Sequence, residues 1–475
     1  MLTKVLIANR GEIALRVARA CRELGIRTVA VYSTADRDSA VVRYADEAVQ
    51  IGPGPAKRSY LNMPALVGAA LRTGADAIHP GYGFLSEDPY FAEACASNGI
   101  AFIGPPPQVI AKLGDKVAAR GLMAEVGVPL LPGSLHPLRT VDQAKAVVDE
   151  IGLPVIIKAA AGGGGRGMSV VRDEADFSRA YRETRAAAQA LFGDNRVYVE
   201  RYLDRARHVE IQVLADGYGA VIQLGERDCS AQRRHQKLVE ETPAPGLAEE
   251  VRRAMGEAAV RGARAAGYVG AGTFEFLYDP ASGGFYFMEV NCRIQVEHPV
   301  TEMATGVDLV AEQIRVAAGE RLRLRQRDVR PHGAVVECRI NVEDPERGFV
   351  PAPGLLAEFV PAGGPFVRVD SHGYPGYKVP AEYDSLLAKL LVWAPDREQA
   401  LERMRRALAE FRVSGPGVHT TAAFLGELIS DPVFRRGEHT TSIVEDVLAA
   451  RTAAPVDLSR KRRQPTGEAP ARRAA

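Results

Sequence analysis

Over the first hundred residues, short apolar runs alternate with stretches whose apolar residues recur every three or four positions. Residues 11–24 have this helical spacing through Ile13, Val17 and Cys21, and residues 59–71 form a second helical stretch. The apolar runs typical of strands lie at 5–8, 28–32, 75–79 and 101–103. Strands separated by helices predict a parallel, doubly wound sheet, which we assign to an N-terminal domain at 1–112.

The pattern changes from about residue 113. A helix is predicted at 118–126, and a connection rich in Pro and Gly follows it at 126–134. Strand-rich runs then lie at 154–159, 168–171, 197–203 and 208–216. In the last of them, apolar residues such as Val209 and Ile211 alternate with polar ones, so one face is buried and the other is polar. A third, more mixed region runs from about 331 to 449.

Composition narrows the class of protein. Of 475 residues, 46 % are hydrophobic and 25 % charged, and the formal net charge is +1, as in an ordinary globular chain. The even charge argues against capture of nucleic acid or anionic membrane, and no apolar run approaches the ~18 residues of a membrane span. Five cysteines without a CxxC pair, together with a start that lacks a signal-peptide core, predict a cytoplasmic protein. The basic stretch 450–475 has no apolar period, which predicts a disordered tail.

Two loops are candidates for ligand binding. HPGYGFLSED (79–88) follows a predicted strand, at the end where doubly wound sheets place ligands, but no GxGxxG follows the first strand to support a dinucleotide site. KAAAGGGGR (158–166) joins two predicted strands without forming a P-loop pattern. Its glycines let the backbone N–H groups approach a polyphosphate, and Lys158 can hold a phosphate as a point charge. For the glycine run alone, a flexible turn is the alternative.

The segment GTFEFLYDPASGGFYFMEVNCR (272–293) predicts a hairpin around DPASGG. Centring the turn on Ser282 pairs Phe274 with Val290, Phe276 with Met288 and Tyr278 with Tyr286 on one face, and Thr273 with Asn291 and Glu275 with Glu289 on the other. Opposed Cβ atoms lie about 4.5–5.5 Å apart, so the two carboxylates must share a proton or a cation. With Asn291 beside them, they suit Mg²⁺ or Mn²⁺ bound jointly with substrate phosphates. A solvated polar face is the alternative.

Two further segments carry charged residues at close spacing. If the strand continues through NCRIQVEHPVTEM (291–303), Arg293, Gln295 and Glu297 lie on one side of it. An arginine fork binds a planar anion such as bicarbonate, and a nearby carboxylate can serve as its general base; a simple Arg–Glu ion pair is the alternative. ERDCSAQRRHQKLVEE (226–241) brings His235 and Lys237 together with arginines, either in a site or on a basic surface.

Together these motifs resemble the biotin carboxylase family of ATP-grasp enzymes. The resemblance covers about residues 1–449 and extends through KVLIANRGEIALR, AIHPGYGFLSE, GGGGRGM, HVEIQVLAD, ERDCSAQRRHQK, the N-x-R-x-Q-V-E-H-P-V-T-E segment and VECRINVEDP. It implies an α/β multidomain chain, in which the N-terminal sheet domain packs against an ATP-grasp module at 113–320. A mobile glycine-rich lid at about 131–204 belongs to that module, and a mixed α/β biotin carboxylase domain follows at 331–449.

The resemblance also implies a role for each matched residue. ATP would be bound by Lys116, Lys158, Gly164, Gly165, Glu200, Arg201, Tyr202, Leu203, His208, His235, Glu275 and Glu289. Two Mg²⁺ or Mn²⁺ ions would be held by Glu275, Glu289 and Asn291. Bicarbonate would be surrounded by Lys237, Arg293, Gln295, Val296 and Glu297, with Glu297 as its base. Arg339 would face the ureido oxygen of biotin and complete a catalytic set of Lys237, Arg293, Glu297 and Arg339.

The implied reaction is the carboxylation of biotin through carboxyphosphate, the first half-reaction of acetyl-CoA carboxylase or a related acyl-CoA carboxylase. No biotinyl-lysine motif of the AMKM kind is present, so we expect biotin on a separate carrier protein, a separate carboxyltransferase subunit and a homodimer. Arg201 stands where many members have lysine, and Cys292 stands where a small or hydroxyl residue is usual; we interpret Cys292 as a packed neutral thiol. The alternatives are another ATP-grasp ligase that joins an acyl phosphate to an amine, and a non-catalytic nucleotide-binding subunit.

Overall fold

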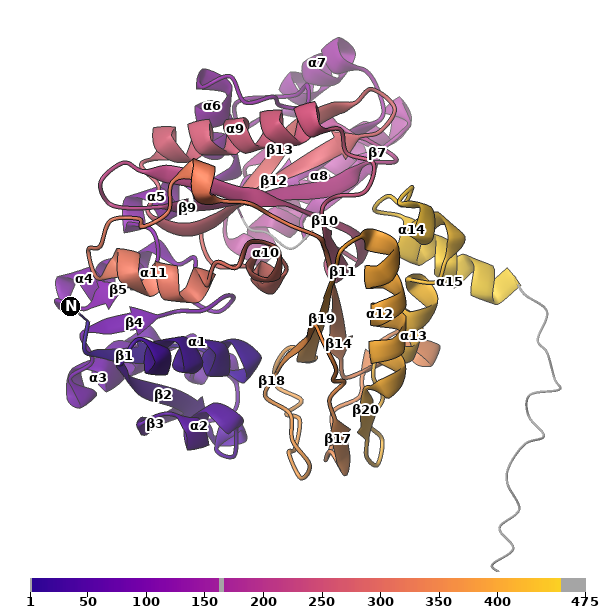
Figure 1. The fold of residues 1–475 in the computed structure, drawn as a ribbon. Coiled ribbons are helices and arrows are strands. Elements are labelled where there is room, and N and C mark those ends of the chain that lie inside the picture. The colour runs from indigo at the N-terminus through magenta and orange to yellow at the C-terminus, as the bar shows by residue number, and fades with distance from the viewer. Residues whose placement is uncertain (1, 162–165, 454–475) are drawn as a thin grey trace, which may run out of the picture.

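A computed structural model describes residues 2–161 and 166–453 (Figure 1). Its N-terminal sheet is parallel, with the order β3-β2-β1-β4-β5. The strands are β1 (Lys4–Ile7), β2 (Arg27–Ser33), β3 (Glu47–Gly52), β4 (Ala77–His79) and β5 (Ala101–Phe102), and the helices between them are α1 (Gly11–Glu23), α2 (Ala40–Tyr44), α3 (Met63–Thr73) and α4 (Pro89–Ser97).

Helices cover both faces of this sheet, which confirms the predicted doubly wound fold. On one face, α1 and α11 (Leu309–Ala317) pack against Val5 and Ile7 of β1. On the other face, α3 and α4 pack against Leu6. Successive residues of a strand point to opposite faces, so an apolar run without alternation is what a sheet covered on both sides requires.

The largest sheet is antiparallel and has eight strands in the order β13-β12-β9-β10-β11-β14-β19-β18. Its strands are β9 (Arg207–Ala215), β10 (Val221–Arg233), β11 (Gln236–Thr242), β12 (Gly270–Asp279), β13 (Gly284–Asn291), β14 (Ala334–Asn341), β18 (Val367–Ser371) and β19 (Leu386–Ala394). The β11–β14 pairing carries the sheet from the central into the C-terminal part of the chain. The two parts therefore share a sheet as well as a chain connection.

Two apolar cores support the ends of this sheet. The first lies under α6 (Lys116–Glu125) and α9 (Glu249–Ala266), and the second under α12 (Arg397–Glu410) and α13 (Ala422–Leu428), on the right of Figure 1. The remaining helices and strands are α5 (Pro107–Gly114), α10 (His298–Thr305), α14 (Pro432–Arg436), α15 (Ile443–Ala453), β15 (Glu343–Asp344), β16 (Val350–Pro351), β17 (Glu358–Val360) and β20 (Arg412–Ser414). The short 3₁₀ helices are η1 (Thr34–Asp36), η2 (Ala56–Arg58), η3 (Gln326–Asp328) and η4 (Pro345–Arg347).

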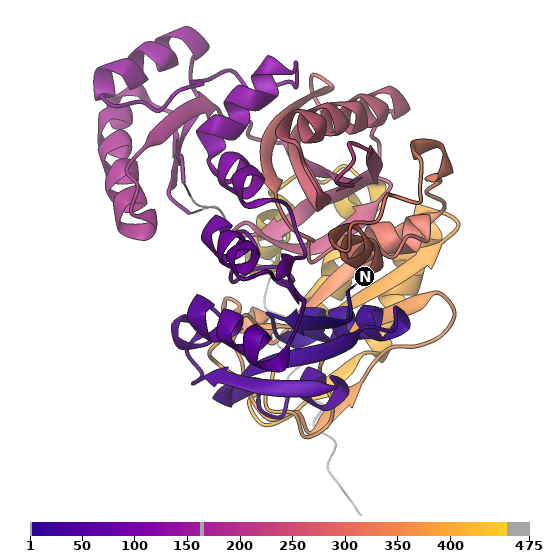
Figure 2. The ribbon, with the colours of Figure 1, turned by 90° about the vertical axis from the view of Figure 1, so that its left-hand side faces the viewer.

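A smaller antiparallel sheet, β7-β6-β8, forms a unit with its own core. It contains β6 (Val155–Ala159), β7 (Met168–Val171) and β8 (Val197–Arg201), covered by α7 (Val141–Ile151) and α8 (Glu174–Phe192). In Figure 2 this unit projects at the upper left, beside the rest of the molecule. The connection from β6 to β7 contains Gly164 and Gly165, which lie outside the described residues.

The predicted hairpin is formed by β12 and β13, and its register is partly as expected. Glu275 opposes Glu289 and Thr273 opposes Asn291, which confirms the polar face. Beyond Glu275 a β-bulge adds one residue to β13, so the predicted Phe276–Met288 and Tyr278–Tyr286 pairs are wrong. Phe276 instead opposes Phe287, and Tyr278 opposes Phe285. The shift places Phe287 in the apolar core, where its ring contacts the rings of Phe274 and Phe276.

At the other end of the described chain, α15 continues to Ala453, past residue 450, where the basic tail was predicted to begin. The rest of that tail lies outside the described residues. Among the residues that the structure describes, no helix is both long enough and apolar enough to cross a membrane.

Candidate active site

A cavity of about 970 Å³ collects the predicted site residues, and all three parts of the chain contribute to its walls. Its walls come from the N-terminal loops, the small sheet and the large sheet, and include Lys116, Lys158, Glu200, Arg201, Tyr202, Leu203, His208, His235, Lys237, Glu275, Glu289, Asn291, Arg293, Gln295, Val296 and Arg339. Glu297 alone among the described predictions is absent from the walls, because it is fully buried behind them. Residues scattered over more than 220 positions of the sequence therefore meet in one place.

The opposed carboxylates of the hairpin each have their own cation. Glu289 Oε2 lies 2.8 Å from Lys116 Nζ, while Glu275 Oε1 lies 3.0 Å from Lys237 Nζ and Glu275 Oε2 lies 3.1 Å from His208 Nε2. Burial works against the charge on Glu275, but Lys237 and His208 outweigh it and hold the pKa of this carboxyl well below its ordinary value. Each acid therefore has its own cationic partner within the protein, and the expectation that the two share a metal ion stays a prediction.

The same residues fit a divalent cation. Glu275 is ionised, Glu289 lies directly across the hairpin, and the Asn291 side chain donates a 2.8 Å hydrogen bond to Glu275 Oε1. Carboxylate and amide oxygens are the ligands that Mg²⁺ and Mn²⁺ prefer, and the ammonium groups already beside them show that this part of the cavity stabilises positive charge. The donor set is thus chemically suited to the predicted ions.

Lys237 joins the carboxylates of three different segments. Its Nζ lies 2.6 Å from Glu210, 3.0 Å from Glu275 and 2.6 Å from Glu297. Although burial opposes its charge, these acids raise the pKa of Lys237 well above the ordinary value. The ammonium group is therefore permanently charged, as a site for an anionic substrate requires.

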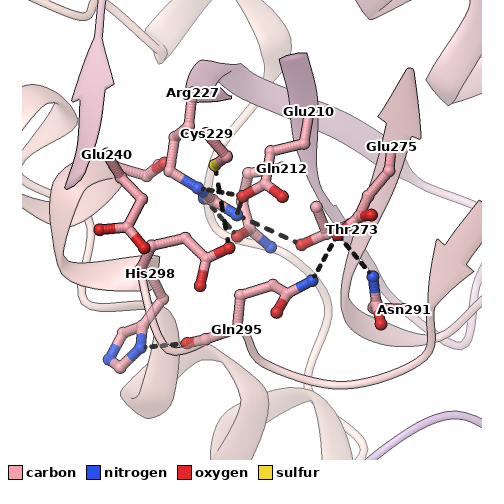
Figure 3. A network of polar contacts seen from close by, with 12 residues as sticks. Glu210, Gln212, Arg227, Cys229, Glu240, Thr273, Glu275, Asn291, Gln295 and His298 are labelled. Atoms are coloured by element: carbon pink, nitrogen blue, oxygen red, sulfur yellow. Dashed lines mark hydrogen bonds and ion pairs between the residues drawn. The ribbon is translucent and has the colours of Figure 1, made fainter. Parts of the chain in front are cut away.

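Beneath Lys237 lies a polar network that is closed to solvent, shown in Figure 3. Arg227 is fully buried and donates hydrogen bonds of 2.7 Å to Glu210, 2.8 Å to Gln212 and 2.8 Å to Thr301. The polar face of β9 is thus buried like its apolar face, because Arg227 of β10 donates hydrogen bonds to Glu210 and Gln212 on that face. Through Glu210, which accepts hydrogen bonds from both Arg227 and Lys237, the network holds Lys237 in place.

The strand does not continue through Arg293 and Glu297. β13 ends at Asn291, and the chain runs as a loop until α10 begins at His298. Pro299 in the first turn of α10 fits a helix start and cannot donate to a sheet ladder. The loop nevertheless gathers the expected side chains, since Arg293 Nη1 donates to Gln295 Oε1 at 2.8 Å.

Arg293 and Glu297 have distinct partners around this loop. Arg293 Nε donates to Glu87 Oε2 at 2.8 Å, so the loop 79–88 of the N-terminal domain contributes to the site. One carboxylate oxygen of Glu297 accepts a hydrogen bond of 2.6 Å from Lys237, and the other accepts one of 2.9 Å from Arg339. Burial opposes the charge of Glu297, but these cations hold its pKa well below the ordinary value, so it is an ionised acceptor.

On the small-sheet side, Lys158 and Arg120 both contact Glu200. Lys158 Nζ makes a short ion pair with one carboxylate oxygen, and Arg120 Nη1 lies 2.7 Å from the other. Arg201 turns its guanidinium toward the carbonyl of Ile151 at the end of α7, to which it donates a hydrogen bond. Part of the Arg201 guanidinium is therefore bound to α7, although the residue lines the cavity.

The turn between β10 and β11 has an unusual backbone. Arg234 and His235 are the two residues between the paired positions Arg233 and Gln236, and their φ angles are 48° and 65°. A two-residue turn with both φ values positive normally contains Asn-Gly or Asp-Gly, because other side chains are strained there. Arg234 and His235 both line the cavity, so the strained turn points toward a functional role.

Several residues of the site escaped the sequence analysis. Glu87, Arg120, Glu210 and Glu240 make short contacts with predicted residues, and Arg227 donates to Glu210 behind them. Glu87 lies in the candidate loop 79–88, and Arg227 and Glu240 lie in the charged segment 226–241, while the alternation in β9 placed Glu210 on a polar face; Arg120 gave no signal. Cys292 is buried, and burial raises its thiol pKa well above the ordinary value, in agreement with a packed neutral thiol.

Comparisons with known proteins define the class first. The model of the carbamoyl-phosphate synthase L chain ATP-binding domain matches residues 115–325, which identifies a nucleotide-dependent ligase. The models of the biotin carboxylase N-terminal and C-terminal domains match residues 1–110 and 337–446. The chain is 54 % identical over 444 residues to the biotin carboxylase of Nostoc sp., covering 94 % of this chain and 99 % of the relative.

Solved structures agree with these matches. A biotin carboxylase–ATP complex from Campylobacter jejuni has a TM-score of 0.91 at 46 % identity, with 94 % of this chain and 99 % of that chain covered. The biotin carboxylase domain dimer of Hydrogenobacter thermophilus 2-oxoglutarate carboxylase, in complex with MgADP, ADP and bicarbonate, also has a TM-score of 0.91, at 49 % identity, covering 96 % and 100 %. The chain belongs to the biotin carboxylase family of ATP-dependent ligases.

Proposed function

We propose that this chain carboxylates biotin on a separate carrier protein, using ATP and bicarbonate and forming carboxyphosphate as the intermediate. One observation carries the proposal most strongly: Lys237 stands between the ionised base candidate Glu297 and the metal-ligand candidate Glu275, 2.6 Å and 3.0 Å away. That juxtaposition places anion activation and nucleotide binding in one cavity. The Hydrogenobacter thermophilus domain has this fold and was solved in complex with MgADP, ADP and bicarbonate, which supports ATP and bicarbonate as the substrates of this chain.

The nucleotide would lie between the small sheet and the hairpin. Lys116 and Lys158 would contact its phosphates, the Gly164–Gly165 backbone would cover them, and Glu200–Leu203, His208 and His235 would line the base and sugar. Glu275, Glu289 and Asn291 would hold two Mg²⁺ or Mn²⁺ ions, whose chemistry is to neutralise the charge that develops on the phosphates. Lys116 and Lys237 would then exchange their carboxylate partners for phosphate oxygens and for bicarbonate.

Bicarbonate would be bound by Lys237, Arg293, Gln295 and the backbone of Val296. Glu297 would accept its proton, and the oxygen so exposed would attack the γ-phosphorus, releasing ADP and forming carboxyphosphate. Arg293, anchored by Glu87 and Gln295, presents a fork suited to a planar anion. Closure of a lid at about 131–204 would exclude water from the short-lived intermediate.

Biotin would enter beside Arg339. Carboxyphosphate would release CO₂ and phosphate, the phosphate would take the ureido N–H proton, and Arg339 would stabilise the ureido anion that captures CO₂. The partners of such a reaction are a biotin carboxyl carrier protein and a carboxyltransferase subunit of an acetyl-CoA or related acyl-CoA carboxylase. A homodimer in the cytoplasm, with domains at 1–112, 113–320 and 331–449, completes the proposal.

The test is ADP formation by the purified chain with Mg²⁺ and ATP, with and without bicarbonate, and then with free biotin. The proposal expects ADP formation to need bicarbonate and to rise with biotin, together with labelled carboxybiotin from labelled bicarbonate. A ligase that joins an acyl phosphate to an amine would respond to an amine substrate and ignore biotin. A non-catalytic subunit would bind ATP without forming ADP, and either result refutes the proposal.

A further inference from the structure

Two carboxyl side chains lie opposite each other next to Arg339, and neither has a role in the reaction described above. Glu240 of β11 and Glu337 of β14 are direct cross-strand partners. Both are completely buried. Opposed positions place their Cβ atoms about 4.5–5.5 Å apart, where two negative charges repel each other strongly. The sheet is therefore built with an acid pair in its interior, under α10.

Three of the four oxygens in this pair have no hydrogen-bond donor among the described residues. Glu240 Oε1 accepts from Arg339 Nε at 2.6 Å, but Glu240 Oε2 and both oxygens of Glu337 have no partner. Burying an ionised carboxylate without a partner costs several kcal/mol, and uptake of a proton removes that cost. A proton on Glu337 also makes an O–H donor, which is what the free oxygen of Glu240 lacks.

The surroundings of the pair contain charges of both signs. The charged groups that act on the pair are Lys237, Glu297, Arg339 and Lys389, with Glu12 beyond Lys389. The thiols of Cys229 and Cys338 also lie close enough to sense its charge. Lys389 is committed to Glu12 at 3.0 Å and to the Val296 carbonyl at 2.9 Å, so it forms no ion pair with Glu337.

The two members of the pair differ in how readily they ionise. Burial, and then the charge of Glu240, raise the pKa of Glu337 well above its ordinary value. Burial also raises the pKa of Glu240, to about 7, and Arg339 limits this rise. The contact with Arg339 thus distinguishes Glu240 as the member that carries the charge.

We infer that Glu240 and Glu337 hold one proton between them in weakly alkaline solution, carried by Glu337, and that the pair positions Arg339 for its substrate. The ionised Glu240 accepts a hydrogen bond from Nε of Arg339, and Glu297 accepts one of 2.9 Å from Nη2. Nη1 makes no hydrogen bond to any described side chain or carbonyl, and Arg339 lines the cavity. The shared proton is inferred from the residues of this chain alone, whereas the identity of the substrate that Arg339 contacts rests on the proposed function.

The proton is tested by infrared difference spectroscopy of the full chain in weakly alkaline buffer, above the pKa of about 7 of Glu240. Subtracting the spectrum of Glu337→Gln from that of the wild type is expected to leave the C=O band of a protonated carboxylic acid. The matched control is Glu346→Gln, which changes an exposed glutamate of the same domain and is expected to leave carboxylate bands only. Carboxylate bands from the Glu337→Gln subtraction would overturn the inference.

The positioning role is tested with Glu240→Gln, which also serves if Glu337→Gln does not fold. Loss of a charge-assisted contact to Arg339 is expected to lower the biotin-carboxylation rate about tenfold. The rate of bicarbonate-dependent ATP cleavage without biotin is expected to stay unchanged. In the wild type the ratio of the two rates should fall as pH drops through about 7, because Glu240 takes up a proton, and this dependence should vanish in the variant. Equal losses in both rates, or an unchanged pH profile, would overturn the role. Absence of ATP cleavage in the wild type would refute the proposed function instead.

Discussion

Replacing Glu289 with Gln tests whether the opposed acids of the hairpin bind a metal ion. The substitution is isosteric and removes one of two carboxylates, while Glu275 keeps Lys237 and His208 as its partners. Two unit charges about 4 Å apart interact by about 1 kcal/mol in water and by about 4 kcal/mol at the effective dielectric near a protein surface. The side chain of Glu289 is 24 % exposed, so its interaction with a cation lies between these limits.

A divalent ion doubles this interaction, but it must compete with the Lys116 ammonium, 2.8 Å from Glu289. We take the net loss as about 3 kcal/mol, which is roughly a hundredfold in affinity. The metal concentration for half-maximal ADP formation should therefore rise about a hundredfold in Glu289→Gln. The measurement is the rate of ADP formation against free Mn²⁺, with MnADP binding followed by calorimetry.

The matched control is Glu257→Gln on α9, where an exposed glutamate pairs with Arg253 at 3.0 Å. Exposed pairs contribute at most about 1 kcal/mol, so metal dependence should be unchanged. If Glu289→Gln needs no more metal than the wild type, the hairpin does not bind the ion and the nucleotide site has to be placed elsewhere.

Three other changes have distinct expected results. Arg339→Ala should lower biotin carboxylation more than bicarbonate-dependent ATP cleavage, and equal losses would contradict its ureido role. Changing Arg234 to Asn and His235 to Gly should stabilise the β10–β11 turn by about 1–2 kcal/mol in urea unfolding and weaken ATP binding in calorimetry; unchanged ATP affinity would show that the turn serves the fold only. Burial lowers the pKa of His372 to about 3, so between pH about 3 and 6.5 the unfolded chain binds one more proton than the folded chain. In this range the free energy of unfolding therefore decreases by about 1.4 kcal/mol for each unit by which the pH is lowered. His372→Gln should reduce the acid slope of the unfolding free energy by that amount, and an unaltered slope would show that His372 is charged in the folded protein.

The part of the site that could be predicted from the sequence depends on local patterns. The turn signal DPASGG was enough to place the hairpin, but the pairs next to the turn are shifted by one residue from the predicted register, and the bulge after Glu275 restores the predicted Glu275–Glu289 pair. The bulge between Glu275 and Phe276 could not be found in this way, because it depends on how Phe287 packs against residues of the core. The loop after Asn291 was missed for a similar reason, since Ile294 is buried in a core shared with the N-terminal sheet.

Long-range partners are the part that sequence alone did not provide. Glu87 reaches Arg293 from 206 positions away, and Glu240 reaches Arg339 from 99. Each is a common acidic residue, and only the fold brings it within hydrogen-bond distance. The eight-stranded sheet was missed as well, because the β11–β14 pairing joins segments that had been assigned to different domains.

Transfer of labelled oxygen tests the central claim most directly. Bicarbonate carrying heavy oxygen is supplied with ATP, Mg²⁺ and biotin in ordinary water, and the phosphate released is analysed by mass spectrometry. Attack of bicarbonate on the γ-phosphorus leaves one of its oxygens in that phosphate, so the account predicts one heavy atom per phosphate formed. Phosphate that contains only oxygen from water or ATP would show that bicarbonate is never the nucleophile, and would contradict the account.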